Sequence, residues 1–287
     1  MRGLLGALDV DVVPLSYPAT SRLRTVLADA TWYPRLRAPR RADVLHCPTF
    51  RGPFRSRAPL VVTVHDLAVL RHPQWFNRWT RGYSRFAVPR VVRAAARVIA
   101  VSEFTKRELV ELLAVPEGKI RVVPNAVEDV FTPEGPSARG DYVLAVGTLE
   151  PRKNLARIAA AVDGELRVVG TRGWGGVEPP PNVTWLGDVS DEDLAAQYRG
   201  ARCLVYASLY EGFGIPVAEA LACGCPVVTS RGTAMEEIAG ADAVYVDPTD
   251  VDSIRDGIAR ASRPQPRRIA SWPDAAAQTR EVYEELV

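Results

Sequence analysis

Short, uninterrupted runs of Val, Leu, Ile and Ala alternate with amphipathic stretches through the second half of this sequence. Strands that are buried on both faces read as continuous apolar runs, and strands separated by helices form parallel sheets through right-handed βαβ units. The pattern predicts a doubly wound α/β domain. The expected strands lie at 142–147, 166–170, 183–187, 201–207, 226–230 and 243–247, and the expected helices at 153–162, 191–199, 216–223, 233–239 and 250–261.

The first half repeats this alternation less completely, which predicts a second Rossmann-like domain. We expect an N-terminal domain over 1–127 and a C-terminal domain over 142–270, joined by a Pro-, Gly- and charge-rich linker at 128–141. A last amphipathic helix at 271–287 is expected to pack back on the N-terminal domain. In the first half, strands are expected at 9–15, 42–48, 58–66, 97–102 and 119–125, and a helix at 102–113 that Ser102 caps.

The charge of the chain is divided unevenly between these two halves. Residues 1–127 carry 21 Lys+Arg against 9 Asp+Glu, and residues 128–287 carry 15 against 25, so the halves have net charges of +12 and −10. A basic first half suits an anionic membrane surface or a phosphate-bearing acceptor. Arginines on solvated helix faces would explain the same numbers. No recognised nucleic-acid-binding motif accompanies the charge, so we expect no nucleic-acid partner.

The cysteines and histidines do not form a metal-binding pattern. The four cysteines include no Cys-x-x-Cys pair, and the chain has three histidines, so we expect no metal site. Free thiols indicate a reducing compartment. The chain shows no signal peptide and no apolar run long enough to span a bilayer. We therefore expect a cytoplasmic protein, with peripheral contact to the inner face of the membrane through its basic N-terminal domain.

One stretch, LYEGFGIPVAEALACGCPVVTS at 209–230, points to chemistry. It follows an expected strand and opens a helix near Pro216, and Gly212 and Gly214 let the backbone approach a ligand closely. The free N–H groups and dipole of a helix start form an anion site that suits phosphate. Glu211 and Glu219 would then accept hydrogen bonds from the hydroxyls of a sugar and a ribose. Alternatively, Glu219 only complements the helix dipole and Glu211 is solvated.

This stretch resembles the Glu-x7-Glu signature of retaining glycosyltransferases of family 4. A second stretch, GTLEPRKN (147–154), is most similar to the sequence of mannosyltransferase-like members of that family. Other stretches agree in order and spacing, and the resemblance covers residues from about 40 to 287. It implies the GT-B fold, with two doubly wound Rossmann-like domains and a cleft between them. The agreeing stretches are VTVHDL (62–67), VIAVSEFTKREL (98–109), VVPNAV (122–127), LAVGTLEPRKNL (144–155) and WLGDVSDEDL (185–194).

The resemblance assigns the donor diphosphate to Arg152 and Lys153. A guanidinium fork and an ammonium together can neutralise a leaving nucleotide without a metal. Many family members have an arginine directly after the glycine that ends the strand. Here Thr148 follows Gly147, so Arg152 is expected to supply that contact.

The resemblance also places His65, with Asp66, against the donor sugar near the reacting carbon, and Glu211 with them among the catalytic residues. A lone histidine at a strand end is otherwise a structural hydrogen-bonding residue. The remaining donor-binding positions that the resemblance implies are Gly147, Gly187, Val189, Phe213, Gly214, Ile215 and Glu219.

The expected reaction transfers a hexose from a nucleotide-diphosphate sugar to a hydroxyl of a glycan or lipid-linked acceptor, with retention of configuration. The transition state is oxocarbenium-like, and charge accumulates on the departing diphosphate. The family lacks an obvious nucleophile on the reacting face, which implies a front-side path. The similarity in sequence to mannosyltransferase-like members favours GDP-mannose as the donor. We expect no cofactor and no metal.

One departure from the family pattern keeps two other functions open. The sequence opens on MRGLLGALDVDVVPL, which resembles the end of a first helix running into a second strand, so the N-terminal strand and its glycine loop have no counterpart. We expect apolar surface to be exposed there. A non-catalytic or degenerate nucleotide-sugar-binding protein is one alternative, and a GT-B nucleotide-sugar epimerase is the other.

Overall fold

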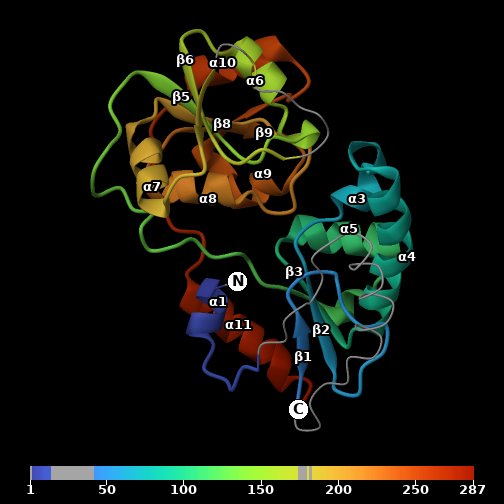
Figure 1. Ribbon diagram of the computed structural model, residues 1–287. Helices are drawn as coiled ribbons and strands as arrows, with labels where there is room; N and C mark the ends of the chain where they lie inside the picture. The colour runs from blue at the N-terminus through green and yellow to red at the C-terminus, as the bar shows by residue number, and fades with distance from the viewer. Residues whose placement is uncertain (1, 14–41, 174–179, 181–182) are drawn as a thin grey trace. The chain divides into compact units, whose positions relative to one another are not determined.

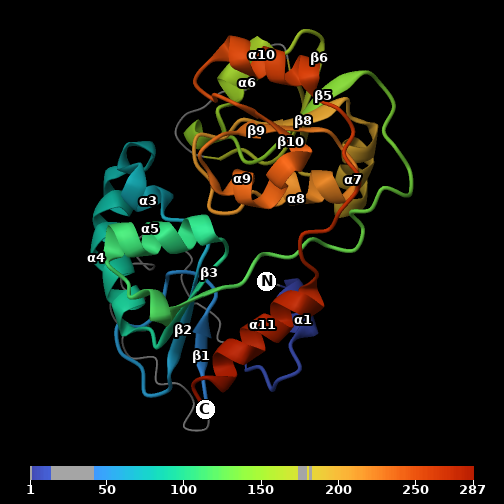
Figure 2. The same cartoon turned by 180° about the vertical axis from the view of Figure 1, so that it is seen from behind.

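The computed structural model describes residues 2–13, 42–173, 180 and 183–287. The chain forms two compact units (Figures 1 and 2). Unit 1 comprises Met1–Pro124 and Trp272–Val287, and unit 2 comprises Asn125–Ser271. Each unit is built around one parallel sheet.

Unit 2 is a doubly wound domain with a six-stranded parallel sheet in the order β10-β9-β8-β5-β6-β7. All six strands expected in this half are present, because each apolar run is long enough to be buried on both faces. β5, β8 and β9 are the most deeply buried. The strands are β5 (Tyr142–Val146), β6 (Glu165–Val169), β7 (Val183–Gly187), β8 (Cys203–Tyr206), β9 (Val227–Ser230) and β10 (Ala243–Val246).

Helices cover both faces of this sheet. α6 and α10 lie on one face, and α7, α8 and α9 lie on the other (Figures 1 and 2). Ser190 caps α7 with its hydroxyl, as its position before two acidic residues predicts. The helices are α6 (Leu155–Ala161), α7 (Asp191–Gly200), α8 (Ile215–Ala222), α9 (Ala234–Ala239) and α10 (Val251–Arg260).

The strand order places a topological switch point between β5 and β8. From β5 the chain continues outward to β6 and β7, whereas from β8 it continues outward to β9 and β10. Ligands of open α/β sheets bind beyond the carboxyl ends of the two strands that flank such a point. In this unit those ends are the loops 147–154 and 207–214.

The segment 128–141, which the sequence suggests as a linker, is part of unit 2 and packs against α7. Phe131 is buried, and its ring meets that of Tyr198 edge-on with 6.0 Å between the ring centres. The carbonyls of Thr132 and Pro136 accept hydrogen bonds from Arg199, and the N–H of Ala138 donates to Ala196 O. Three backbone groups of the segment are therefore held by α7.

Unit 1 contains a four-stranded parallel sheet in the order β1-β2-β3-β4. Its core packs strand residues such as Val62 and Val98 against Val88 and Leu109 of two helices. Ser102 caps α5, as expected. The elements are α1 (Arg2–Ala7), β1 (Leu45–Cys47), β2 (Leu60–Val64), α3 (Ala68–Arg71), α4 (Arg78–Ala94), β3 (Arg97–Ala100), α5 (Glu103–Leu113), β4 (Ile120–Val122) and α11 (Trp272–Glu284).

The strand expected at 9–15 is wrong for its described part, because residues 9–13 form no strand. Positions 14 and 15 lie outside the described residues. Two acidic residues, Asp9 and Asp11, interrupt this apolar run, and the segment finds no partner strand among the described residues. Leu5, Val10, Val12 and Val13 are exposed.

Unit 1 also includes the C-terminal helix α11, which is held by hydrogen bonds and ion pairs as well as by packing. His46 of β1 is hydrogen-bonded on both sides, with Nδ1 2.6 Å from the Tyr283 hydroxyl and Nε2 2.8 Å from Thr63 Oγ1. Glu285, just beyond α11, accepts hydrogen bonds from Arg97 of β3 and Arg121 of β4. The last residues of the chain are thereby tied to three strands of the unit 1 sheet.

Within the described residues, no helix combines the length and the apolar character that crossing a membrane requires.

Candidate active site

The loop after β8 is shaped by Gly214 at the start of α8. Gly214 has a φ of +93°, and a Cβ at this position would lie 2.8 Å from Met235 Cγ. Both the left-handed backbone and the close packing therefore require glycine. The backbone N–H groups of Phe213, Gly214 and Ile215 donate to no described residue. The start of α8 accordingly keeps free donors of the kind that bind an anion.

The loop after β5 is a short 3₁₀ turn, Pro151–Lys153, that Asn154 fastens to the neighbouring strand. Asn154 adopts a left-handed conformation with a φ of +59°, and its side-chain amide donates to Ala207 O at 3.0 Å and Pro248 O at 2.6 Å. The backbone of Leu209 donates to Arg152 O at 2.8 Å. The two loops of the switch point are thus bonded to each other.

Arg152, Lys153 and Glu211 meet at this junction. Arg152 Nη1 donates to Glu211 Oε2 at 2.6 Å, and Lys153 Nζ donates to Glu211 Oε1 at 2.7 Å. Arg152 also pairs with the buried Glu150 at 2.9 Å. Lys153 Nζ makes a second hydrogen bond, of 2.5 Å, to the hydroxyl of Tyr206. Two carboxylates and two cations therefore form one network whose formal charges cancel.

The network holds its members charged despite their burial. Burial alone would raise the pKa of Glu211, but the charges and hydrogen bonds of Lys153 and Arg152 hold it below its usual value. Burial alone would lower the pKa of Lys153, but Tyr206 and Glu211 hold it above its usual value. Glu211 is consequently an anion, and Lys153 a cation, over the whole physiological pH range.

Gly147, at the end of β5, lies directly against this lysine. Its φ is +146°, and a Cβ there would come within 3.1 Å of Lys153 Cε. The stem of Lys153 is therefore laid along the strand end, with the ammonium directed toward Tyr206 and Glu211. Gly187, which ends β7, also has a positive φ, and Val189 beyond it is half-buried.

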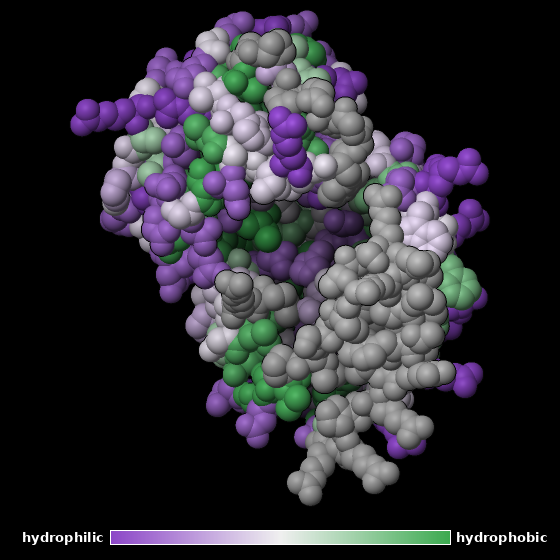
Figure 3. Space-filling view, in the orientation of Figure 1, coloured by the Kyte–Doolittle hydropathy of each residue, from purple (hydrophilic) through white to green (hydrophobic). Residues whose placement is uncertain are grey.

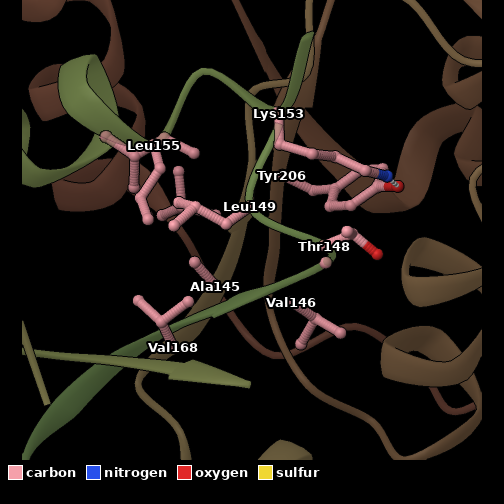
Figure 4. Close-up of a pocket in the computed structure, with 11 residues that line it drawn as sticks. Ala145, Val146, Thr148, Leu149, Lys153, Leu155, Val168 and Tyr206 are labelled. Carbon is pink, nitrogen blue, oxygen red and sulfur yellow. Dashed lines mark hydrogen bonds between the residues drawn. The ribbon is translucent and has the colours of Figure 1, made fainter. Parts of the chain in front are cut away.

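A pocket opens beside the network at the end of β5 (Figure 4). Its polar side chains are Lys153, Tyr206 and Thr148, and its other side chains are apolar. In Figure 4 the amine of Lys153 and the hydroxyl of Tyr206 lie side by side, away from the apolar group. That group includes Leu149 and Leu155. The full lining is Ala145, Val146, Gly147, Thr148, Leu149, Lys153, Leu155, Ile158, Val168, Val205 and Tyr206.

Glu219 lies apart from this network, on α8. Its Oε2 accepts a hydrogen bond of 2.9 Å from the hydroxyl of Tyr198 on α7, whereas Oε1 accepts none from a described residue. Burial raises the pKa of Glu219 to about 7, and the hydrogen bond from Tyr198 opposes the rise. Within the described part of unit 2, no hydrogen bond or ion pair joins Glu219 to Arg152, Lys153 or Glu211.

The other predicted site residues differ in which of their groups are accessible to a ligand. The side chain of Phe213 is buried in the core, so only its backbone is available to a ligand, whereas Ile215 is exposed. In unit 1, Asp66 accepts from the N–H of Ala68 at 3.0 Å and so begins α3. His65 is exposed and bonds through Nε2 to Pro48 O at 3.0 Å. Partial desolvation by the surrounding chain nevertheless lowers the pKa of His65, so its ring stays neutral down to a lower pH than an ordinary histidine does.

Several residues of the site were missed from sequence. Glu150 and Asn154 lie inside the quoted motif, and their polar character next to two cations was a usable signal. Tyr206 and Tyr198 gave no such signal, because a tyrosine in a strand or helix is ordinarily part of the core.

The fold defined by these two units is GT-B. Sucrose-phosphate synthase from Thermosynechococcus elongatus matches with a TM-score of 0.65 and 20% identity, over 96% of this chain and 77% of the other. Anabaena HepE in complex with UDP and glucose matches with a TM-score of 0.63 and 17% identity, over 94% and 80%. WaaG, a glycosyltransferase involved in lipopolysaccharide biosynthesis, matches with a TM-score of 0.62 and 14% identity, over 97% and 89%.

Sequence similarity narrows the class further. The model of "Glycosyltransferase Family 4" matches residues 4–131, and that of "Glycosyl transferases group 1" matches residues 176–272. O-antigen chain mannosyltransferase B of Escherichia coli is 31% identical over 85% of this chain and 74% of its own length. The MMP alpha-(1->4)-mannosyltransferase of Mycolicibacterium hassiacum is 29% identical over 80% of this chain, and this chain spans 66% of its length. The chain belongs to glycosyltransferase family 4.

Proposed function

We propose that this glycosyltransferase transfers mannose from GDP-mannose to a hydroxyl of a glycan or lipid-linked acceptor, with retention of configuration. The sugar is inferred from relatives that are named as mannosyltransferases in Escherichia coli, Mycolicibacterium hassiacum and Salmonella typhimurium. A nucleotide-diphosphate donor is supported by a solved structure of the same fold that holds UDP and glucose. The proposal includes peripheral contact between the basic unit 1 and the inner face of a membrane.

The observation that carries the proposal is the network of Arg152, Lys153 and Glu211 at the switch point of unit 2. Lys153 has three N–H donors, and two of them are used by Tyr206 and Glu211. The third is available to a diphosphate oxygen. Arg152 and Lys153 would stabilise the charge that accumulates on the leaving diphosphate, together with the free N–H groups at the start of α8.

Glu211 has a different part in this proposal. Its two oxygens already accept from the two cations, and each oxygen retains a further lone-pair site. Those sites would accept hydrogen bonds from hydroxyls of the donor sugar. A carboxylate bound to the same cations as the diphosphate would also fix the distance between sugar and phosphates. Glu219 would accept from the ribose through Oε1.

The chemical step follows from where the charge develops. The bond between the anomeric carbon and the diphosphate oxygen breaks, and the acceptor oxygen forms its bond on the same face of the sugar. The acceptor proton passes to the departing phosphate. His65 and Asp66 would lie against the donor sugar, as the family resemblance implies. The proposal includes no metal, because Arg152 and Lys153 would donate charged hydrogen bonds to the leaving diphosphate.

The proposal is tested by replacing Lys153 with Ala. Removal of one preorganised charge donor is expected to lower turnover of GDP-mannose by about 10²–10³-fold. Arg260→Ala removes an exposed cation from α10 and serves as the matched control, with unchanged turnover. Near-full activity of Lys153→Ala would contradict the diphosphate site.

The donor is identified by thermal-shift measurements with GDP-, UDP- and ADP-sugars, in which GDP-mannose is expected to give the largest rise in melting temperature. A rise without turnover on any acceptor would favour the non-catalytic binding protein. A new nucleotide-sugar formed without any acceptor would favour the epimerase.

A further inference from the structure

Glu219 is held on one side by a tyrosine that is itself fully buried. Tyr198 of α7 has 0% of its surface exposed, and its hydroxyl donates to Oε2 of Glu219 at 2.9 Å. Oε1 accepts no hydrogen bond from a described residue, and the described part of the chain does not enclose it, so a ligand can reach it. The carboxylate therefore presents one oxygen to the protein and one to a ligand.

The ring of Tyr198 has little freedom to turn. Phe131, which is also buried, meets it edge-on with 6.0 Å between the ring centres. The next residue of α7, Arg199, donates to the carbonyls of Thr132 and Pro136 and so fixes the segment that carries Phe131. Where Figure 1 draws α7, Figure 3 shows mainly hydrophilic side chains on the surface, whereas Tyr198 lies beneath them. A ring that is packed in this way carries its hydroxyl to one position.

Glu219 lies one helical turn beyond the proposed phosphate site. It follows Ile215, the first residue of α8, by four positions, so the two lie on the same side of the helix and about 6 Å apart along its axis. The N–H groups at the start of α8 suit the diphosphate. In a nucleoside diphosphate, the group attached to the phosphates on the side away from the transferred sugar is the ribose, which carries hydroxyl donors. Oε1 of Glu219 is therefore placed to accept a hydrogen bond from the ribose.

Tyr198 also acts on the charge of Glu219. Burial raises the pKa of Glu219 to about 7, and the hydrogen bond from Tyr198 opposes that rise, whereas the charges of Asp191 and Glu128 add to it. An ionised carboxylate only accepts hydrogen bonds, whereas a protonated one also donates. The tyrosine therefore favours the form of Glu219 that accepts from a hydroxyl.

We propose that Tyr198 is a positioning residue for the ribose of the donor nucleotide. By holding Oε2 of Glu219, it directs Oε1 toward a ribose hydroxyl, and the site thereby distinguishes a ribonucleotide from its deoxy counterpart. The inference rests on the proposed function for the presence of a nucleotide beside α8. It goes beyond that function because it assigns ribose selectivity to a buried residue of α7.

The test is calorimetric titration of the full chain with GDP, 2′-deoxy-GDP and 3′-deoxy-GDP, at pH 7 and at pH 8.5. In the unaltered chain, at least one deoxy form should bind about tenfold or more weakly than GDP, because a hydrogen bond to a charged group is lost. In Tyr198→Phe this difference should fall to about twofold or less, while the affinity for that deoxy form stays unchanged. General damage to the fold would instead weaken the binding of all three nucleotides equally, and that result would overturn the proposal.

Tyr142→Phe is the matched control, because it removes a buried tyrosine hydroxyl that donates to Gln197 O of the same helix at 2.8 Å. It should keep the full difference between GDP and the deoxy form. A second control combines Tyr198→Phe with Glu219→Ala. Tyr198→Phe should cause no further loss of GDP affinity in that background, because the tyrosine acts through this carboxylate. A further loss would show that Tyr198 acts elsewhere and would overturn the proposal.

The remaining outcomes separate this proposal from the proposed function. The proposal is overturned if Tyr198→Phe distinguishes the nucleotides as the unaltered chain does. It is also overturned if pH 8.5 restores the difference in Tyr198→Phe, since the tyrosine would then act only through the charge of Glu219. If UDP or ADP binds in place of GDP, the deoxy forms of that nucleotide are used, because all three share the ribose. Binding of no nucleotide would overturn both proposals, whereas ribose selectivity without turnover of GDP-mannose would count against the proposed function alone.

Discussion

Lys153 and Glu211 lie 2.7 Å apart at the junction of the loops after β5 and β8, and both are charged. The pair joins the Arg-Lys turn to the Glu-x7-Glu stretch, which are separated by 58 positions in sequence. A donor diphosphate that reaches Lys153 therefore meets a cation that already has an anionic partner.

Glu211→Gln distinguishes the effect of this carboxylate on nucleotide binding from its effect on sugar transfer. The substitution leaves a hydrogen-bonding group of the same size but changes the formal charge of the Glu150, Arg152, Lys153 and Glu211 network from zero to +1. We expect free GDP to bind at least as tightly as before, because the cations lose a competing anion, while turnover falls by about 10²-fold. Calorimetric titration with GDP and steady-state kinetics measure the two effects. Weaker GDP binding together with normal turnover would contradict the assignment.

Tyr206→Phe removes the hydroxyl that accepts from Lys153 and retains the ring. A lost hydrogen bond to a charged group corresponds to about a tenfold effect or more, so kcat should fall about tenfold, less than for Lys153→Ala. The matched control is Tyr245→Phe, which removes a tyrosine hydroxyl that donates to Gly240 O elsewhere in unit 2. If both variants lose the same activity, Tyr206 does not position Lys153.

The raised pKa of Glu219 makes the stability of unit 2 depend on pH. Because burial raises this pKa from its usual value of 4.5 to about 7, the neutral form is favoured in the folded state. The stabilisation that the neutral carboxyl of Glu219 gives the folded state is fully present below pH 4.5 and is lost as pH rises through 7. Glu219→Gln cannot ionise, so its melting temperature should rise relative to that of the unaltered chain as pH increases from 5 to 8. Tyr198→Phe should move this window upward, because the hydrogen bond from Tyr198 lowers the pKa.

His46 makes unit 1 sensitive to acid. Burial, with a smaller contribution from His65, lowers the pKa of His46 from 6.5 to about 4. The neutral ring is favoured in the folded state, so its contribution is present above pH 6.5 and is lost as pH falls through 4. In denaturant titrations, His46→Gln should show a smaller loss of unfolding free energy between pH 7 and 4. An unchanged pH dependence would mean that other groups govern acid unfolding.

Local sequence was sufficient for most of the fold because unit 2 consists of buried parallel strands, whose runs of apolar residues are distinctive. Helix caps such as Ser190 and Ser102 were readable for the same reason, since a cap depends only on its own first turn. α4 was missed because its five arginines, Gly82 and Pro89 obscure the apolar positions. The run at 9–15 was misread because alternation alone does not supply a partner strand.

The site was predictable only as separate motifs. The sequence placed Arg152, Lys153 and Glu211 at strand ends but could not show that one carboxylate pairs with both cations, because such pairing depends on strand order. It also could not show that Tyr198 holds Glu219, since a contact between two helices is not encoded in either helix. The donor-binding and catalytic roles of all the predicted site residues, including His65, Asp66, Gly187 and Val189, remain predictions.

Unit 1 is interrupted in the chain by unit 2, and α11 returns to it only at Trp272. The ribosome therefore synthesises all of residues 125–271 before it synthesises the helix that bonds to His46. Because domains fold as their residues emerge, the later unit in the sequence can finish folding before the earlier one does. Truncation of the chain before Trp272 would therefore remove α11 from unit 1 and leave all residues of unit 2 in place.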